Sequence, residues 1–241
     1  GVSEIPSGII LSMIGYKGTY LLAAVSLLLS LVLLIPLIPN VPRIKAQSIF
    51  IADFGKIFKI RAIYWVSISI LTYLLGWNIL YPTFSIVLSQ IFKAPTALTG
   101  AIFAVATLLN GLGAFIWGPV VDRLGGRKAL PMGILLSAGS AFSLLIGLED
   151  MWLYSILLWL MIAFGIVGMP GTSYVVQRSV SPEYYSIATT IIWLFQIIPG
   201  AISGFISGAI LAGLRLRTTI IIAAIIELIG GLMMLGLPKG V

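Results

Sequence analysis

The sequence predicts an all-α protein, a polytopic bundle of transmembrane helices. Hydrophobic residues make up 60% of the 241 positions and charged residues only 9%, whereas a soluble domain carries about a quarter charged residues. The hydrophobic residues form long uncharged runs, and the 14 Lys and Arg residues lie in the short segments between them. A run that crosses lipid must satisfy its own backbone polar groups, so we expect each run to be a helix.

The uncharged runs predict seven complete spans and one truncated span. Residues 1–14 look like the last part of a span whose beginning is missing, so we expect further N-terminal helices of the same chain. Residues 19–38 contain no charge over 20 positions, about the length that crosses a ~30 Å hydrocarbon core. The remaining spans are expected at 62–90, 97–117, 129–148, 151–176, 184–212 and 218–237.

Residues 41–61 are the one sizeable break in this pattern. Within the break, the stretch SIFIADFGKIFKI separates into an apolar side and a basic side when it is wound as a helix. This separation predicts a helix that lies on the inner membrane surface. An early start of the following span is the alternative interpretation.

The basic residues predict the orientation of the bundle. Alternate connections hold ten Lys or Arg residues on one side and four on the other, namely Lys17, Lys93, Arg215 and Arg217. Cytoplasmic loops carry the excess of Lys and Arg, so we expect a cytoplasmic-membrane protein with its C-terminus inside. The net charge of +7 does not indicate nucleic-acid binding, because the basic residues are spread among these connections.

Missing residue types exclude several kinds of chemistry. The chain contains no Cys and no His, which excludes a disulfide framework, thiol chemistry and metal or haem sites built on histidine. No set of residues resembles a catalytic constellation. We therefore expect no enzyme activity, no metal and no cofactor.

A charged connection joins the spans at 97–117 and 129–148. It carries the pattern G-x-x-x-D-R-x-G-x-R-K, formed by Gly118, Asp122, Arg123, Gly125, Arg127 and Lys128. The pattern resembles the signature loop of the major facilitator superfamily of secondary transporters, although Gly126 stands where that family usually has a third basic residue. An ordinary positive-inside loop is the alternative interpretation.

The resemblance implies a domain organisation. Residues 1–40 would be the end of the fifth helix and the sixth helix, residues 41–61 a cytoplasmic linker, and residues 62–241 the C-terminal six-helix half. A shift of the chain by 200 residues places Lys17 on Arg217 and Ala23-Ala24 on Ala223-Ala224. Such an echo between two segments is what structurally repeated halves predict.

The resemblance also implies a gate at the signature loop. Asp122 would accept hydrogen bonds from the N-terminus of a neighbouring helix, where backbone N–H groups favour an anion. Arg123 and Arg127 would pair with Glu183, which lies on the same predicted side. These contacts would hold the inner side closed and would break when the transporter opens inward.

Polar and aromatic residues within the spans predict a substrate cavity. Tyr73, Trp77 and Tyr81 recur every four residues on one helix face, next to Asn78. Gly76 and Pro82 bracket this stretch, and broken helices line the binding sites of many transporters. The alternative is an aromatic face packed against a neighbouring helix.

Two later spans add cavity candidates. Gln196 lies near the middle of the span at 184–212, and Trp193 precedes it on the same face. Asn110 is the polar candidate in the span at 97–117. Neither Asn78 nor Gln196 has an obvious partner on its own helix, so we expect both amides to face a polar cavity.

Two acidic residues, Glu4 and Glu227, are expected to lie inside the membrane. An intramembrane charge costs about 2.5–3.5 kcal/mol on insertion scales, so such residues are usually functional or paired. In a chain without His, they are the predicted proton carriers. Glu4 lies beside Pro6 and Gly8, where exporters of the resembled superfamily have a glycine-proline motif. For Glu227, an interhelical packing role is the alternative.

The sequence thus predicts a secondary active transporter that works by alternating access. We expect proton-coupled export of a small neutral or amphipathic solute, by a monomer whose partners are the solute, protons and the lipid bilayer. Uptake of a sugar or metabolite by a symporter is one alternative. A transporter-like receptor that binds a solute without moving it is another.

Overall fold

The computed structural model describes residues 21, 24–26, 28–30, 32–33, 51–213 and 215–240. The predicted truncated span with Glu4, most of the span at 19–38 and the first part of the linker lie outside these residues. The helices of the bundle are α2 (Ile51–Phe58), α3 (Arg61–Ile86), α4 (Thr96–Leu124), α5 (Gly126–Gly147), α6 (Met151–Gly165), α7 (Gly168–Ser179), α8 (Tyr185–Gly213) and α9 (Leu216–Met233).

Six stretches of the described residues are long and apolar enough to cross a membrane. They are Arg61–Ile91, Thr96–Leu124, Gly126–Gly147, Met151–Ser179, Pro182–Ser203 and Leu216–Gly236. The first includes a π-helical turn at Val87–Ile91, and the last includes a 3₁₀ turn at Met234–Gly236. These stretches correspond to the last six predicted spans and confirm the prediction of an all-α membrane bundle.

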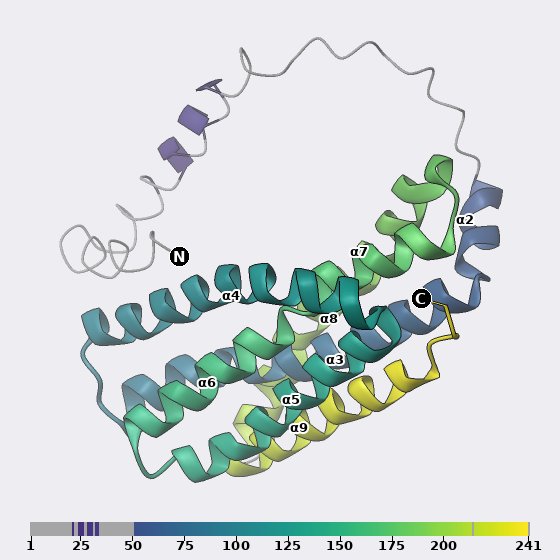
Figure 1. Cartoon of the computed structure of the whole chain (residues 1–241). Coiled ribbons are helices and arrows are strands. Elements are labelled where there is room, and N and C mark those ends of the chain that lie inside the picture. Colours follow the sequence, from purple (N-terminus) through teal and green to yellow (C-terminus); the bar gives the residue numbers. More distant parts are fainter. Residues whose placement is uncertain are drawn as a thin grey trace.

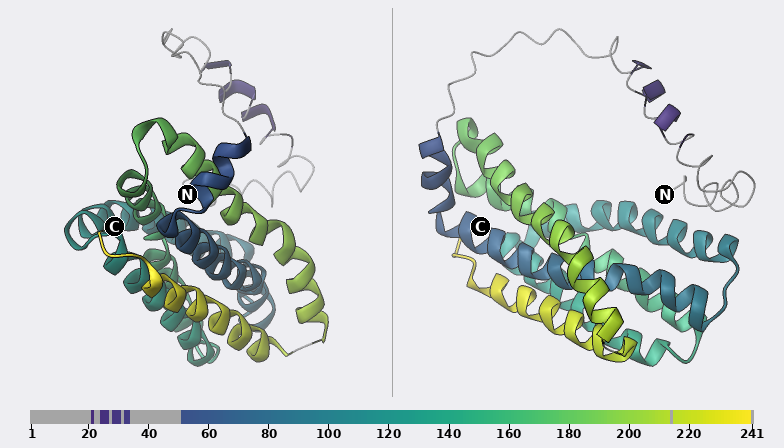
Figure 2. Two further views of the ribbon diagram at one scale, coloured as in Figure 1. Left: turned by 90° about the vertical axis from the view of Figure 1, so that its right-hand side faces the viewer. Right: turned by 180° about the vertical axis from the view of Figure 1, so that it is seen from behind.

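The helices run side by side in a bundle with α3 in its interior (Figure 1). On one side α3 packs against α9, and on another it packs against α8, which crosses it in the view from behind (Figure 2). Helix α5 packs against both α6 and α9, and α4 lies along α6. The core is therefore built around α3 and α5.

Helix α2 lies within the predicted linker and packs against the bundle. Ile57 is buried, and the ring of Phe58 stacks on Phe195 of α8 with 5.3 Å between the ring centroids. On its other side, Lys56 forms an ion pair with Asp53, with 3.2 Å between the charged atoms. The helix is thus amphipathic, with its apolar side against α8.

The structure corrects the predicted loop between the spans at 97–117 and 129–148. Helix α4 continues through Asp122 and Arg123 to Leu124, and Gly125 alone separates it from α5. Gly125 has a φ of 76°, a value that glycine adopts readily because it has no Cβ. The prediction failed because charged side chains end the apolar run without ending the helix, whose backbone hydrogen bonds do not depend on side-chain polarity.

The predicted span at 151–176 consists of two helices. Helix α6 ends at Gly165 and α7 begins at Gly168, with Ile166 and Val167 between them. Pro170 lies in the first turn of α7. A backbone N–H at this position would have no acceptor within the helix, so proline, which lacks the N–H, costs no helical hydrogen bond there. Glycines and this proline therefore allow the chain to break inside an apolar span.

Candidate functional site

A cavity of about 180 Å³ opens beside the break between α6 and α7. Four helices besides α7 border the cavity: α3, α4, α6 and α8. Four of the seven residues predicted for a substrate cavity line it, namely Tyr73, Trp77, Asn110 and Gln196. These side chains come from three helices, so the fold brings together residues that are far apart in the sequence.

A second hollow of about 310 Å³ adjoins the cavity. It lies between α4, α7 and α8, and Trp193 forms part of its wall. Gln196 and Met169 line both spaces, so the two hollows meet at these residues. Three hydroxyl side chains add polarity to the second hollow, namely Thr172, Ser173 and Thr189.

The amides of Gln196 and Asn110 make no hydrogen bond to any residue that the structure describes. Gln196 lies on α8 and Asn110 on α4, and both are half-buried. Each amide offers both a donor and an acceptor to the cavity. The cavity therefore combines apolar and aromatic walls with two groups that could orient a polar part of a ligand.

The structure does not place Asn78 and Tyr81 in the cavity wall. The side-chain amide of Asn78 donates a 2.7 Å hydrogen bond to the Leu74 carbonyl oxygen, which corrects the expectation that it lacks a partner on its own helix. Tyr81 is 54% exposed, and its ring centroid lies 6.4 Å from that of Phe103 on α4. Each step of four residues turns the helix by about 40° beyond a full turn, so Tyr81 is rotated by about 80° from Tyr73.

Tyr73 connects the cavity to the interior of the bundle. Its side chain is 3% exposed, and its hydroxyl lies 3.3 Å from the Oγ atom of Ser137 on α5. The same hydroxyl lies against Gly165, where a Cβ atom would take its place. Tyr73 thus reaches from α3 across to α5 and to the last residue of α6.

Glu227 is fully buried on α9. Neither of its carboxylate oxygens has a hydrogen-bond partner within the described part of the chain. The hydroxyl of Ser137 lies close to the carboxyl without forming a hydrogen bond to it. A Cβ atom on Gly76 of α3 would lie 2.8 Å from the Glu227 Cγ atom, so the acid packs directly against the α3 backbone.

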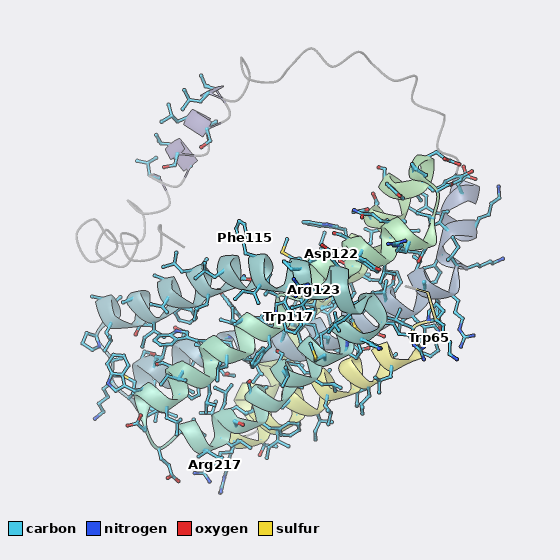
Figure 3. The ribbon with its side chains drawn as sticks, in the orientation of Figure 1. Trp65, Phe115, Trp117, Asp122, Arg123 and Arg217 are labelled. Atoms are coloured by element: carbon cyan, nitrogen blue, oxygen red, sulfur yellow. The ribbon has the colours of Figure 1, made fainter. Side chains whose placement is uncertain are left out.

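The predicted gating residues lie around the α4–α5 junction. Asp122, Arg123 and Lys128 are exposed, and Arg127 is half-buried. Figure 3 shows Asp122 and Arg123 on the last turns of α4. It also shows Arg217 and Trp65 at opposite ends of the bundle. Gly118 lies within α4, and a Cβ atom on it would meet nothing within 4 Å. Gly126, the departure from the family pattern, abuts α7, since a Cβ atom there would lie 2.8 Å from Val175.

Glu183 is not brought together with Arg123 or Arg127. It is exposed, and its carboxylate accepts a 2.8 Å hydrogen bond from the Ser181 hydroxyl. Over residues 51–213 and 215–240, the ion pair of Lys56 and Asp53 is the one observed. The predicted pairing is therefore not a contact of the conformation described.

Sequence reasoning missed Ser137 and Gly230. A Cβ atom on Gly230 of α9 would lie 2.6 Å from the Tyr73 backbone nitrogen, so this glycine brings α9 against α3. The Gly230-Gly231 pair in an apolar span was a detectable sign of close helix packing. Ser137 gave no such sign, because the same span also carries Ser140 and Ser143, whose hydroxyls bond to their own helix.

A comparison with protein families identifies one match. The family model described as Major Facilitator Superfamily matches residues 66–240, from the first turns of α3 to the C-terminal end. This match covers more than half of the chain. No curated protein matches the sequence.

Proposed function

Because the chain belongs to the major facilitator superfamily, a family of secondary transporters, we propose that it exports a small neutral or amphipathic solute across the cytoplasmic membrane in exchange for protons. The six apolar stretches make it a multi-pass membrane protein. The ten-to-four distribution of Lys and Arg favours a C-terminus inside the cell. A monomer is the proposed functional unit, because the described residues of a single chain enclose the cavity without a second copy.

The observation that supports this function is the composition of the cavity. Its lining includes two aromatic side chains and two amides, and no charged residue among those that the structure describes. Aromatic and aliphatic walls bury the apolar part of a ligand, and a few placed polar groups orient it. A strongly charged solute would find no counterion there, which favours a neutral or amphipathic one.

The break between α6 and α7 supports alternating access. Gly165 and Gly168 flank the break, and both line the cavity. Discontinuous helices at the binding site are a recurring feature of secondary transporters, in which one part of the protein rocks against another around the site. The break provides a place where α7 moves relative to α6 as access alternates.

The residues at the α4–α5 junction form the inner gate of this cycle. Asp122 is exposed at the end of α4, in a position to accept hydrogen bonds from the N-terminus of a helix outside the described residues. Glu183 leaves Ser181 and pairs with Arg123 or Arg127 when the inner side closes. Opening the inner side breaks both contacts.

Transport by the full-length protein in proteoliposomes tests the function. A panel of radiolabelled neutral and amphipathic compounds is presented with and without an imposed proton gradient. Gradient-driven accumulation on the side that corresponds to the cell exterior supports export, whereas accumulation in the opposite direction supports an uptake symporter. Saturable binding without gradient-driven accumulation would identify the receptor alternative and would contradict the proposal.

Asp122→Asn tests the gate. We expect transport to fall at least about fivefold, because losing a contact that biases two conformations is worth about 1–3 kcal/mol. A single cysteine at Thr172, in the second hollow, should become more reactive from the inner side; the chain itself contains no Cys. Asp150→Asn is the matched control, because Asp150 caps α6 by accepting a 2.7 Å bond from Leu153 N and Asn caps equally well. Unchanged transport and reactivity would remove Asp122 from the gate.

Proton coupling is assigned to the two membrane carboxyl groups, Glu4 and Glu227. Glu227 is fully buried, and ionisable groups within membrane spans either pair with other groups or mark ion and proton pathways. Glu4→Gln is expected to abolish gradient-driven accumulation while sparing solute exchange. Accumulation that keeps its wild-type dependence on pH in this variant would leave Glu227, or a helix outside the described residues, as the proton carrier.

A further inference from the structure

We infer that the hydroxyl groups of Tyr73 and Ser137 form a path along which a proton passes between the cavity and the carboxyl group of Glu227. This inference rests on the proposed function, because the cavity is the transport site in that proposal. It adds a proton route through the C-terminal helices, formed by one residue each from α3, α5 and α9. Sequence reasoning did not connect these three residues.

The end of the path that lies inside the helix bundle is the Glu227 carboxyl group, which has no counterion. Glu227 is fully buried, and the elements packed against α9 are α3, α5, α8 and the turn at Met234–Gly236. The basic residues of these elements and of α9 are Arg61, Arg127, Lys128 and Arg217. Each lies roughly 14–18 Å along its own helix from Tyr73, Ser137 or Glu227. Tyr73, whose backbone packs against Gly230 one turn along α9 from Glu227, is the titratable side chain of α3 at this contact. An ionised carboxylate in this position would lack both a cation and a hydrogen bond, so the site accommodates the neutral acid.

Ser137 lies between the acid and the tyrosine. Its Oγ atom is 3.3 Å from the Tyr73 hydroxyl, and either oxygen can be the donor. Glu227 packs against Gly76, one turn along α3 from Tyr73. Its carboxyl neighbours the Ser137 hydroxyl without a hydrogen bond to it, so proton transfer requires the two groups to move into hydrogen-bond contact. Because a hydroxyl both donates and accepts, Ser137 can receive a proton from one neighbour and pass its own to the other.

The transfer conserves protons at every oxygen. Protonated Glu227 gives its proton to the Ser137 oxygen while Ser137 gives its own to the Tyr73 oxygen. In the same concerted step Tyr73 gives its original proton to an acceptor in the cavity, either water or the solute. Both hydroxyls end with one proton, Glu227 ends as a carboxylate, and the reverse sequence reloads the acid.

The other end of the path is the Tyr73 hydroxyl, which reaches the cavity at Gly165. Tyr73 and Gly165 both line the cavity, and the Tyr73 hydroxyl lies against Gly165. At the Glu227 end, Gly76 and Gly230 leave room for direct contact between α3 and α9. The absence of side chains at these three glycines therefore lets Tyr73 and Glu227 lie at the positions between which the proton moves.

The rate of hydrogen–deuterium exchange at Glu227 tests the path. Full-length protein in lipid nanodiscs, without solute, is studied by infrared difference spectroscopy, in which a protonated carboxyl gives a distinct C=O stretching band. Glu227→Gln removes the band and assigns it; Glu227→Asp, which shifts the band, assigns it where the Gln variant does not fold. After transfer to D₂O, we expect Tyr73→Phe and Ser137→Ala to keep the band and to slow its exchange by about tenfold, the effect of losing one buried hydrogen bond.

Two matched controls separate the path from general packing. Tyr154→Phe removes another buried tyrosine hydroxyl, in the other apolar cluster of the bundle. Ser140→Ala removes a hydroxyl of α5 that donates a 3.0 Å bond to the Leu136 carbonyl oxygen. Both controls should exchange at the wild-type rate.

Two outcomes would overturn the inference. No band assignable to Glu227 would mean that the acid is not held protonated. Wild-type exchange in both Tyr73→Phe and Ser137→Ala would mean that protons reach Glu227 by another route. Neither outcome depends on transport, so a protein that fails to accumulate any solute would contradict the proposed function alone.

Discussion

Helix α3 presents two unlike faces to its neighbours. On one face, Ile70, Leu74 and Trp77 border the cavity together with Gln196 of α8. On the other, Gly76 packs against Glu227, and the Tyr73 backbone packs against Gly230, with no room for a methyl group at either glycine. One helix therefore separates an open space from one of the closest contacts in the described bundle.

The difference shows what decides whether a membrane helix face opens or closes. Both faces are apolar, and lipid offers no hydrophobic drive to bring helices together. Small residues close the α9 side because they allow backbones to approach, whereas large side chains and the break between α6 and α7 leave the cavity open on the other side of α3. Side-chain size, more than polarity, therefore distinguishes the two faces.

Gly230→Ala should disrupt the packing of α3 against α9 and have the largest effect on the protein, a loss of stability. The added Cβ atom would lie 2.6 Å from Tyr73 N and 2.8 Å from Tyr73 Cα, and backbone atoms cannot move aside as a flexible side chain can. Overpacking of this kind destabilises by about 1–3 kcal/mol. We expect less folded protein and a lower melting temperature in detergent, measured by fluorescence-detected size-exclusion chromatography.

Gly139→Ala is the control for this substitution. Gly139 lies in α5, where an added Cβ atom would meet nothing within 4 Å. Ala is favoured over Gly inside a helix by about 1 kcal/mol, so this variant should be at least as stable as the wild type. Equal melting temperatures for Gly230→Ala and the wild type would show that the α3–α9 contact is looser than described.

Gln196→Ala probes the open face and should have the second largest effect. The amide lines both hollows and makes no hydrogen bond to a described residue, so the fold does not need it. Its loss should weaken binding of the transported solute about tenfold, the value of one hydrogen bond in a dry site, and leave the melting temperature unchanged. Equilibrium binding of the labelled solute to purified protein measures the change.

Thr190→Ala is the matched control on α8. Thr190 is exposed, and its hydroxyl donates a 2.8 Å bond to the Ser186 carbonyl oxygen of its own helix. Solute affinity should not change in this variant. A loss of folded protein in Gln196→Ala, with wild-type affinity in what remains, would make Gln196 a packing residue.

Much of the fold could be predicted from the sequence because lipid imposes a strong constraint. Apolar runs of bilayer length must be helices, and each of the six later predicted spans overlaps a stretch long and apolar enough to cross a membrane. Helix boundaries were harder to predict. Charged residues at 122 and 123 suggested a loop where the helix continues to Leu124, and apolar residues at 166 and 167 hid the break between α6 and α7.

The cavity was predictable only in part, for a related reason. Amides and aromatic residues in the middle of a span are conspicuous, so Tyr73, Trp77, Asn110 and Gln196 could be selected. In a helix that is apolar all round, no hydrophobic face shows which way a residue points. Tyr81 was therefore placed on the cavity face and Ser137 was overlooked, since their positions depend on how the helices are rotated in the bundle.

Asn78→Ala tests how far the cavity-facing side of α3 extends, and it should have the smallest effect on solute affinity and stability. Asn78 lies on α3, and its Oδ1 atom approaches Gly200 of α8, 3.8 Å from where a Cβ atom on that glycine would lie. Its amide N–H is already satisfied by the Leu74 carbonyl at 2.7 Å. Removing that bond costs about 0.5–1.5 kcal/mol, and the better helix propensity of Ala offsets up to about 0.7 kcal/mol.

We therefore expect Asn78→Ala to lower solute affinity by less than Gln196→Ala does, with little change in melting temperature. The same binding assay and melting measurement decide the outcome. If Asn78→Ala weakens binding as much as Gln196→Ala, the amide must leave Leu74 and contact the solute in the bound state. Asn78 would then belong to the open face of α3, and that face would extend further along the helix than the cavity does without solute.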